Sequence, residues 1–126
     1  MPRLPSENLT DREAQMMEIL WRDGAQSAEA VRLALDDQPH DSTVRTLLRI
    51  LAQKGYVRIR GRQPALYEAA IARSRVQAKA TRNLLTRFFA GSVTDLVQQL
   101  VEDKQLSPEE LDRIGKSFKA RRRKGG

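Results

Sequence analysis

Apolar residues in the first half of the chain recur at the spacing of amphipathic helices. The pattern predicts three helices, over residues 10–23, 27–35 and 41–54, each ending at a glycine or at a break that contains proline. The period then changes to two over residues 56–60, and a turn with glycine and proline precedes a second short strand at 65–68. Three helices followed by a two-stranded hairpin is the element order of a winged helix-turn-helix.

Helix start signals support these three helices. Thr10 and Glu13 have the spacing of a capping box, in which the threonine side chain accepts the Glu13 amide and Glu13 reaches back. Ser27 is a suitable N-cap for the second helix, and Asp41 or Ser42 for the third.

The second half has the pattern of three further helices, at about 73–90, at about 92–104 and from residue 107 onward. Ser107 as N-cap with Glu110 three residues later marks the last start. These helices carry more apolar side chains than an isolated segment of this size can bury, so they need a partner. The cationic tail at 119–126 is expected to be disordered at its end. Its basic run at 121–124 either adds nonspecific DNA affinity or keeps the chain in solution.

A chain of 126 residues fits one small domain with an appended element. We expect a mainly α fold, with a winged helix-turn-helix DNA-binding domain over 1–72 and a C-terminal helical dimerisation segment with a basic tail over 73–126. No apolar run approaches the roughly 20 residues that span a bilayer. The N-terminus also lacks the apolar stretch of a signal peptide, so the expected location is the cytoplasm.

The chain contains no cysteine and a single histidine, His40. This composition excludes disulfides, thiolate zinc sites and cysteine nucleophiles, and it leaves no histidine pair for a metal. The 16 carboxylates come with no nucleophile motif and no phosphate-binding loop. We therefore expect no enzyme, no catalytic residue, no metal and no cofactor.

Positive charge is distributed unevenly along the chain. Of the net charge of +7, most lies in the second half: residues 1–72 carry 10 basic and 10 acidic residues, whereas 73–126 carry 13 and 6. Within the neutral first half, residues 41–62 hold six cations and one carboxylate. A local positive surface of this kind indicates a polyanionic partner.

The third helix is the candidate recognition helix, because the second helix of a helix-turn-helix presents its N-terminal residues to base edges. Its polar face carries Thr43, Arg45, Thr46 and Arg49. Arginine suits bidentate contacts to guanine, and threonine can contact phosphate or a thymine methyl group. Ser42 can cap the helix, place its hydroxyl beside a phosphate, or do both.

Three arginines follow on the hairpin, at Arg58, Arg60 and Arg62. As a wing they would lie along the DNA backbone or in the minor groove and supply affinity more than specificity. Alternatively, the three arginines only prevent this edge strand from pairing with a strand of another chain. A second function remains open as well: a winged helix whose basic face meets an acidic protein, without sequence-specific DNA binding.

Several motifs in register resemble the penicillinase-repressor family of the BlaI and MecI type. They are Leu-Thr-x-x-Glu at 9–13, Met-Glu-Ile-Leu-Trp at 17–21, Ser-Thr-Val-Arg-Thr-Leu-Leu-Arg at 42–49, Lys-Gly-Tyr-Val at 54–57 and Leu-Ser-Pro-Glu-Glu-Leu at 106–111. The resemblance covers nearly the whole chain. It implies a homodimeric repressor whose winged helix binds an inverted-repeat operator in double-stranded DNA, while the C-terminal helices interlock with a second subunit.

The resemblance also implies targets and a partner. In the best-known members the targets are β-lactamase or resistance genes, and a membrane-bound sensor protease cleaves the repressor in its dimerisation helices. The Asn-Phe pair cut there aligns with Gln99-Leu100, so this chain departs from the pattern. A copper-responsive branch binds metal through cysteines, which this chain lacks. On apolar content and on this resemblance, the predicted dimer seam consists of Leu84, Leu85, Phe88, Phe89, Leu96, Val97, Leu100, Leu111 and Ile114.

Overall fold

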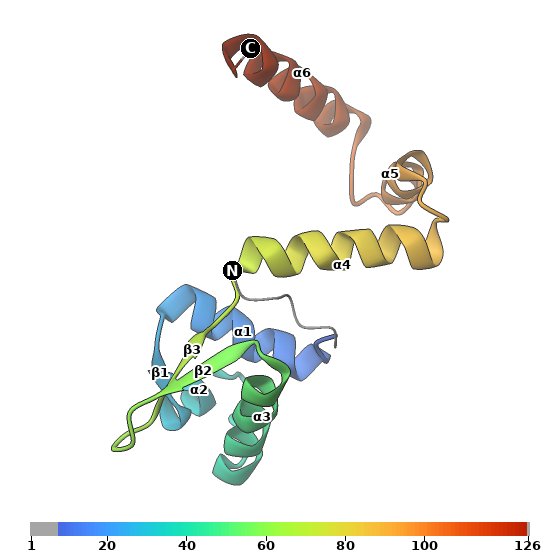
Figure 1. Ribbon diagram of the computed structural model, residues 1–126. Helices are drawn as coiled ribbons and strands as arrows, with labels where there is room; N and C mark the ends of the chain where they lie inside the picture. The colour runs from blue at the N-terminus through green and yellow to red at the C-terminus, as the bar shows by residue number, and fades with distance from the viewer. Residues whose placement is uncertain (1–7, 126) are drawn as a thin grey trace. The chain divides into compact units, whose positions relative to one another are not determined.

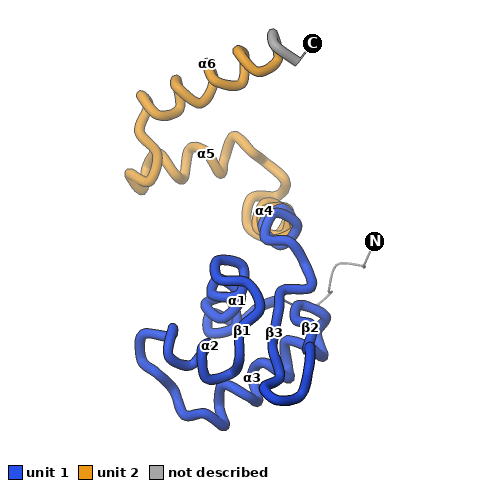
Figure 2. Tube along the Cα trace, turned by 90° about the vertical axis from the view of Figure 1, so that its left-hand side faces the viewer, with its two compact units in different colours: residues 1–78 blue, residues 79–126 orange. Residues whose placement is uncertain are grey.

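The computed structural model of the chain describes residues 8–125, with side chains described up to residue 122 (Figure 1). The chain divides into two compact units, one up to Ala78 and one from Lys79 onward (Figure 2). The sequence-based boundary after residue 72 stays a prediction. The N-terminal segment that was searched for a signal peptide, and the side chains of Arg123 and Lys124 in the basic run, lie outside the described residues.

The first unit is a winged helix with three helices and a three-stranded sheet, which confirms the predicted mainly α fold (Figure 1). Its elements are α1 (Asp11–Asp23), β1 (Gln26–Ser27), α2 (Ala28–Ala34), α3 (Asp41–Lys54), β2 (Val57–Arg60) and β3 (Leu66–Ala69). The strands are antiparallel in the order β1-β3-β2. The predicted two-stranded hairpin is confirmed as β2 and β3. The sequence analysis missed β1, which adds a third strand too short to show an alternating pattern.

The first helix forms the predicted capping box. The Thr10 side-chain oxygen accepts the Glu13 amide at 3.1 Å, and the Thr10 amide donates to Glu13 Oε1 at 2.8 Å. The helix begins at Asp11 and not at Thr10, because the cap residue itself has extended backbone angles. Gly24 follows the helix at φ 79°, a backbone region that glycine enters without steric cost.

One hydrophobic cluster holds the first unit together. In it α2 packs on α3, α3 on β2, and α1 on β3. The fully buried apolar side chains at its centre are Met16, Met17, Leu20, Val31, Val44, Leu48 and Leu51. Trp21 lies at the margin, where its indole Nε1 donates to the Ile71 carbonyl at 2.9 Å. Because three residues of α3 are anchored in this core, the rotation of that helix about its axis is fixed.

A buried ion pair joins the start of α1 to the end of α3. Glu13 is only 1% exposed, and Lys54 Nζ donates to its two carboxylate oxygens at 2.8 and 3.0 Å. Lys54 Nζ also donates to the Asn8 carbonyl at 3.3 Å. Burial by itself raises the pKa of Glu13, but the hydrogen bonds from Lys54 and Thr10 outweigh it, so this pKa lies below its ordinary value.

Replacing Glu13 by glutamine is expected to lower the free energy of unfolding by about 3 kcal/mol, because Lys54 is left without its partner in a mostly buried site. The pair also makes stability depend on pH. The pKa of Glu13 is lower in the folded than in the unfolded chain, so its contribution is complete above the unfolded value near 4.5. That contribution is lost as pH falls through the folded pKa.

Urea titrations at several pH values between about 7 and 3 measure both effects. The wild type should lose stability toward acid more steeply than the Glu13→Gln variant. Glu18→Gln is the matched control, since Glu18 is an exposed residue of the same helix that pairs with Arg73 at the surface. Parallel pH curves for wild type and Glu13→Gln would contradict the prediction.

Three helices make up the rest of the chain: α4 (Arg73–Phe88), which begins in the first unit, α5 (Val93–Glu102) and α6 (Pro108–Gly125). All three were predicted, although α4 and α5 end two residues earlier than expected. The helix α6 continues to Gly125, and Gly126 lies outside the described residues, so the predicted disorder at the end of the tail stays a prediction. Among the residues that the structure describes, no helix combines the length and apolar character needed to cross a membrane.

The start of α6 has the predicted capping box. Ser107 Oγ accepts the Glu110 amide at 3.1 Å, and the Ser107 amide donates to Glu110 Oε1 at 3.2 Å. In contrast to the first unit, the described part of the chain from residue 79 onward contains no buried side chain. Local signals therefore define these helices without a core to pack on.

Candidate nucleic-acid interface

The helix-turn-helix consists of α2 and α3, and α3 presents one polar face to solvent. The predicted site residues on this helix are all exposed: Ser42, Thr43, Arg45, Thr46 and Arg49. The opposite face consists of residues that are 0% exposed: Val44, Leu48 and Leu51. The positions 42, 45, 46 and 49 follow the i, i+3, i+4, i+7 spacing that places side chains along one stripe of a helix. The fold thus brings the predicted recognition residues together on one surface.

The N-terminus of α3 is capped by His40, so the prediction of Asp41 or Ser42 as the cap was wrong. His40 Nδ1 accepts the Ser42 amide at 3.1 Å, and the Ser42 hydroxyl lies 2.8 Å from the same nitrogen. Because an amide can only donate, Nδ1 is the acceptor in this cap. Aspartate and serine are the commoner cap residues, which is why sequence reasoning passed over the histidine. Ser42 lies one residue inside the helix.

The two arginines of α3 differ in their surroundings. Arg45 Nε lies 2.8 Å from Asp41 Oδ2, one helical turn earlier, and this hydrogen bond raises the pKa of Arg45 above its ordinary value. Arg49 forms no ion pair within the described residues. One predicted base-reading arginine is therefore held by its own helix, while the other is free to reach a ligand.

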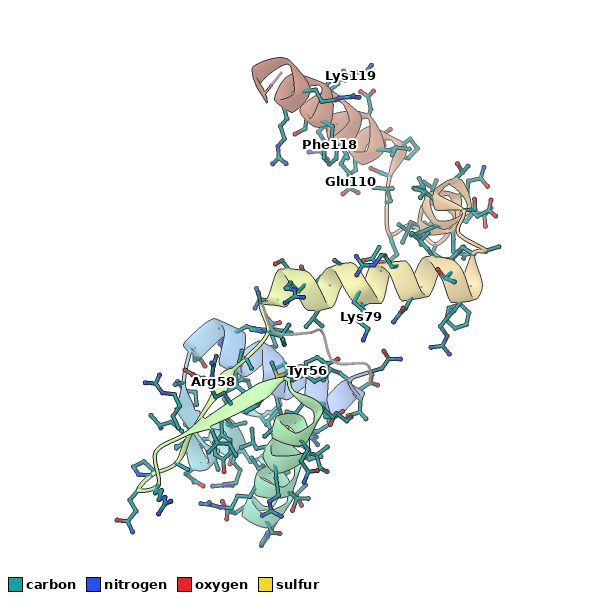
Figure 3. The ribbon with its side chains drawn as sticks, viewed as in Figure 1. Tyr56, Arg58, Lys79, Glu110, Phe118 and Lys119 are labelled. Atoms are coloured by element: carbon teal, nitrogen blue, oxygen red, sulfur yellow. The ribbon has the colours of Figure 1, made fainter. Side chains whose placement is uncertain are left out.

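The wing consists of β2, β3 and their connection, which projects away from the helices (Figure 1). Val57 points into the core, and Arg58 and Arg60 follow it by one and three residues along the strand. Alternate residues of a strand point to opposite faces. Arg58 (labelled in Figure 3) and Arg60 therefore lie on the outer face, with 61% and 65% of their side chains exposed. Arg62, also exposed, follows Gly61, whose φ of 73° is readily adopted only by glycine.

One carboxylate holds two of these wing arginines. Glu68, on the central strand β3, is the cross-strand partner of Arg58. Arg58 Nε lies 3.1 Å from Glu68 Oε1, and Arg60 Nη1 lies 3.2 Å from Glu68 Oε2. Arg62 has no such partner among the described residues. Sequence analysis did not single out Glu68, since its role depends on the strand register and not on its neighbours in the chain.

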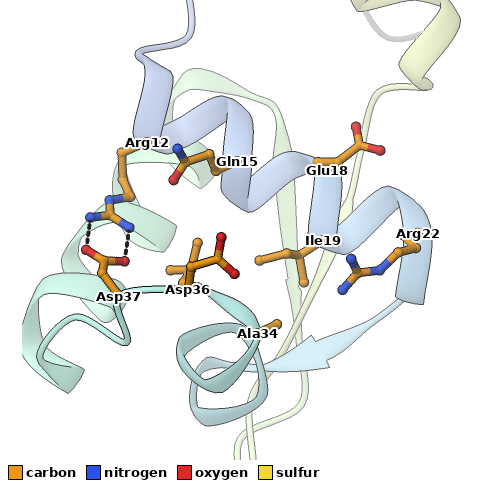
Figure 4. A pocket seen from close by; sticks show the side chains of 9 residues that line it. Arg12, Gln15, Glu18, Ile19, Arg22, Ala34, Asp36 and Asp37 are labelled. Atoms are coloured by element: carbon orange, nitrogen blue, oxygen red, sulfur yellow. Dashed lines mark hydrogen bonds and ion pairs between the residues drawn. The ribbon is translucent and has the colours of Figure 1, made fainter.

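A polar groove lies between α1 and the loop that leads into α3 (Figure 4). Its lining includes Arg12, Gln15, Glu18 and Arg22 of α1 together with residues 34–37. Arg12 donates through both terminal nitrogens to Asp37, at 2.7 Å for Nη1, and this hydrogen bond holds the pKa of Asp37 below its ordinary value. No predicted DNA-binding residue lines the groove. Within the described residues there is also no cluster of three or more metal-ligating side chains.

The predicted dimer residues are distributed over the three C-terminal helices. They are Leu84, Leu85 and Phe88 on α4, Phe89 just after it, Leu96, Val97 and Leu100 on α5, and Leu111 and Ile114 on α6. None of them is buried, and Phe88 is 69% exposed. Two further large apolar residues were left out of the predicted seam: Val93, which is 60% exposed, and Phe118, which is 58% exposed and labelled in Figure 3.

Comparisons with known proteins identify similar sequences. The profile of the penicillinase repressor family matches residues 9–120 of the chain. The methicillin resistance regulatory proteins MecI of Mammaliicoccus sciuri, Staphylococcus aureus strain N315 and Staphylococcus epidermidis are each 26% identical to it over 111 residues, which are 84% of this chain and 89% of each relative.

Among solved structures, one of BpsR from Bordetella bronchiseptica covers 98% of this chain and 80% of its own, with 19% identity and a TM-score of 0.47. It is described as showing how 6-hydroxynicotinic acid regulates DNA binding by that protein.

Proposed function

Since the chain belongs to the penicillinase repressor family, whose members are DNA-binding transcriptional repressors, we propose that it acts as a homodimer on an inverted-repeat operator. The observation that carries this proposal is the exposed polar stripe of α3, fixed in rotation by the buried face of the same helix. A helix presented in this way can enter the major groove, where each base pair has a distinct pattern of donors and acceptors.

Each residue of the interface has a proposed role. Thr43, Arg45, Thr46 and Arg49 contact base edges, where bidentate arginine contacts to guanine give the most discrimination. Ser42 lies in the first turn of α3, where the helix N-terminus favours an anion, and its hydroxyl contacts a phosphate. The wing arginines Arg58, Arg60 and Arg62 contact the DNA backbone, which positions the protein without reading sequence.

The C-terminal helices supply the proposed dimer contacts. Their apolar side chains are at most half-buried within the described chain, and a second copy of the same helices would remove more of them from water. A two-fold dimer places its two recognition helices on half-sites about 34 Å apart, one turn of DNA. This geometry supports a palindromic operator.

The target genes and the inducing partner are proposed on the family resemblance alone. β-Lactamase-type, resistance or sensor genes are the proposed targets, and a membrane sensor protease is the proposed partner. The aligned cleavage pair, Gln99-Leu100, lies inside α5. There Gln99 Nε2 donates a hydrogen bond to Asp103 Oδ2 at 3.0 Å. A protease would have to unwind this helix to reach the bond.

Fluorescence-anisotropy titration tests the proposed function. The purified protein is titrated against the DNA upstream of its own gene and against a scrambled duplex of equal length, at two salt concentrations. Much tighter binding to the upstream duplex, saturating at two chains per site, is the expected result. Equal and strongly salt-dependent binding to both duplexes would refute recognition of that DNA. Absence of any binding would favour the protein-interaction function instead.

A further inference from the structure

We infer that Glu68 is a built-in competitor for DNA phosphate, which limits the sequence-independent part of the DNA affinity. The inference rests on the proposed function, since it concerns the wing arginines as backbone contacts. The observation behind it does not depend on that function: a single carboxylate on the central strand forms ion pairs with two of the three wing arginines, at 3.1 and 3.2 Å.

The strand register determines this arrangement. Arg58 lies directly opposite Glu68, and Arg60 lies one diagonal position away, opposite Leu66. Glu68 is 24% exposed, whereas the two arginines are 61% and 65% exposed. The carboxylate is therefore set into the sheet while the guanidinium groups extend beyond it. A phosphate approaching either arginine also approaches the charge of Glu68.

Two effects follow when DNA binds. Exposed ion pairs of this kind are weak, so a phosphate oxygen can replace the carboxylate at each arginine. The carboxylate then stays close to the phosphate and repels it, which cancels part of the attraction that the two arginines supply. Fewer counterions are released than two free arginines would release, so the affinity for any duplex and its salt dependence both fall.

This limit matters for a chain with a net charge of +7, whose nonspecific attraction to DNA is otherwise strong. A repressor must find its operator among a large excess of other sites, and bulk DNA competes for it through phosphate contacts alone. Asp41 holds Arg45 in a similar way. Asp41 also lies in the first turn of α3, where its carboxylate interacts favourably with the helix dipole. Replacing Asp41 would therefore change the helix as well as the ion pair, so Glu68 is the residue chosen for the test.

The experiment measures binding of the full chain to a random-sequence duplex between about 50 and 200 mM salt. Glu68→Gln keeps the size of the side chain and removes its charge. Asp23→Asn is the matched control, because Asp23 lies on α1 and pairs with Arg22 at 2.8 Å, not with a wing arginine. A third comparison places Glu68→Gln in an Arg58→Gln/Arg60→Gln background.

Glu68→Gln is expected to bind the random duplex roughly three- to tenfold more tightly at the lowest salt. The slope of log K against log salt should steepen by about 0.9 for each protomer bound. Asp23→Asn should change affinity by less than about twofold, and the effect of Glu68→Gln should disappear without the two arginines. Thermal melting checks that each variant is folded.

Three outcomes would overturn the inference. Equal effects of Glu68→Gln and Asp23→Asn would show that only net charge matters, and the proposed function would stand. Weaker binding by Glu68→Gln would show that the carboxylate positions the arginines for DNA and does not compete with it. Absence of wild-type binding to both the random and the upstream duplex would refute the proposed function as well.

Discussion

Alanine at both Arg45 and Arg49 is expected to abolish the preference for the operator over a scrambled duplex. A bidentate contact between arginine and guanine discriminates between bases by about 1 to 3 kcal/mol. Two such contacts on one recognition helix therefore correspond to a loss of discrimination of at least about thirtyfold. Anisotropy titrations with the two duplexes give the ratio directly. Both side chains are exposed, so the fold should be unchanged.

The single variants should separate the two arginines. Arg49 is unpaired in the described structure, whereas Arg45 must first leave Asp41 to reach a base. Arg49→Ala should therefore cost more discrimination than Arg45→Ala. Arg22→Ala is the matched control, because Arg22 is an exposed helix arginine paired with Asp23 at 2.8 Å and lies outside the proposed interface. Equal loss of affinity for operator and scrambled DNA in the double variant would reassign α3 to backbone contacts alone.

The winged-helix order could be predicted because its signals are local. The capping pairs Thr10 with Glu13 and Ser107 with Glu110 form the hydrogen bonds that their spacing predicts. The apolar period of α3 also identified which of its faces is buried, and with it the exposed stripe that contains the site. His40 was missed because an imidazole caps a helix through a ring nitrogen, which the usual cap preferences do not cover.

Features that depend on distant parts of the chain could not be predicted in this way. The two-residue strand β1 is defined only by its pairing with β3. The Glu13–Lys54 pair joins residues 41 positions apart, and neither residue carries a local signal of that contact. The ion pairs of Glu68 could not be predicted either, since the strand register alone brings its two arginines close to it. The sequence therefore predicted the cations of the wing but not the carboxylate that holds two of them.

Loss of dimerisation should have the other large effect, and Leu100→Lys is the variant chosen to produce it. Leu100 lies on α5, a helix with no buried residue in the described chain, and in the proposed dimer a second copy covers its apolar face. A charge placed on that face is costly to bury. The molecular mass in light scattering should fall from twice 14.3 kDa to 14.3 kDa. Affinity for the full operator should fall by roughly 100-fold or more, because the two half-sites are no longer bound together.

Gln98→Lys is the control that separates dimerisation from added charge. Gln98 is exposed on the same helix, two residues from Leu100, so the variant introduces the same cation without altering the apolar face. It should stay dimeric and bind the operator at least as tightly as the wild type, since one more cation favours DNA. Circular dichroism tests whether Leu100→Lys keeps its helices. A monomeric wild type at micromolar concentration, or a dimeric Leu100→Lys, would contradict the proposed seam. An unimpaired monomer would mean that one winged helix suffices for the operator, since the advantage of a dimer lies in joining two weak half-site contacts.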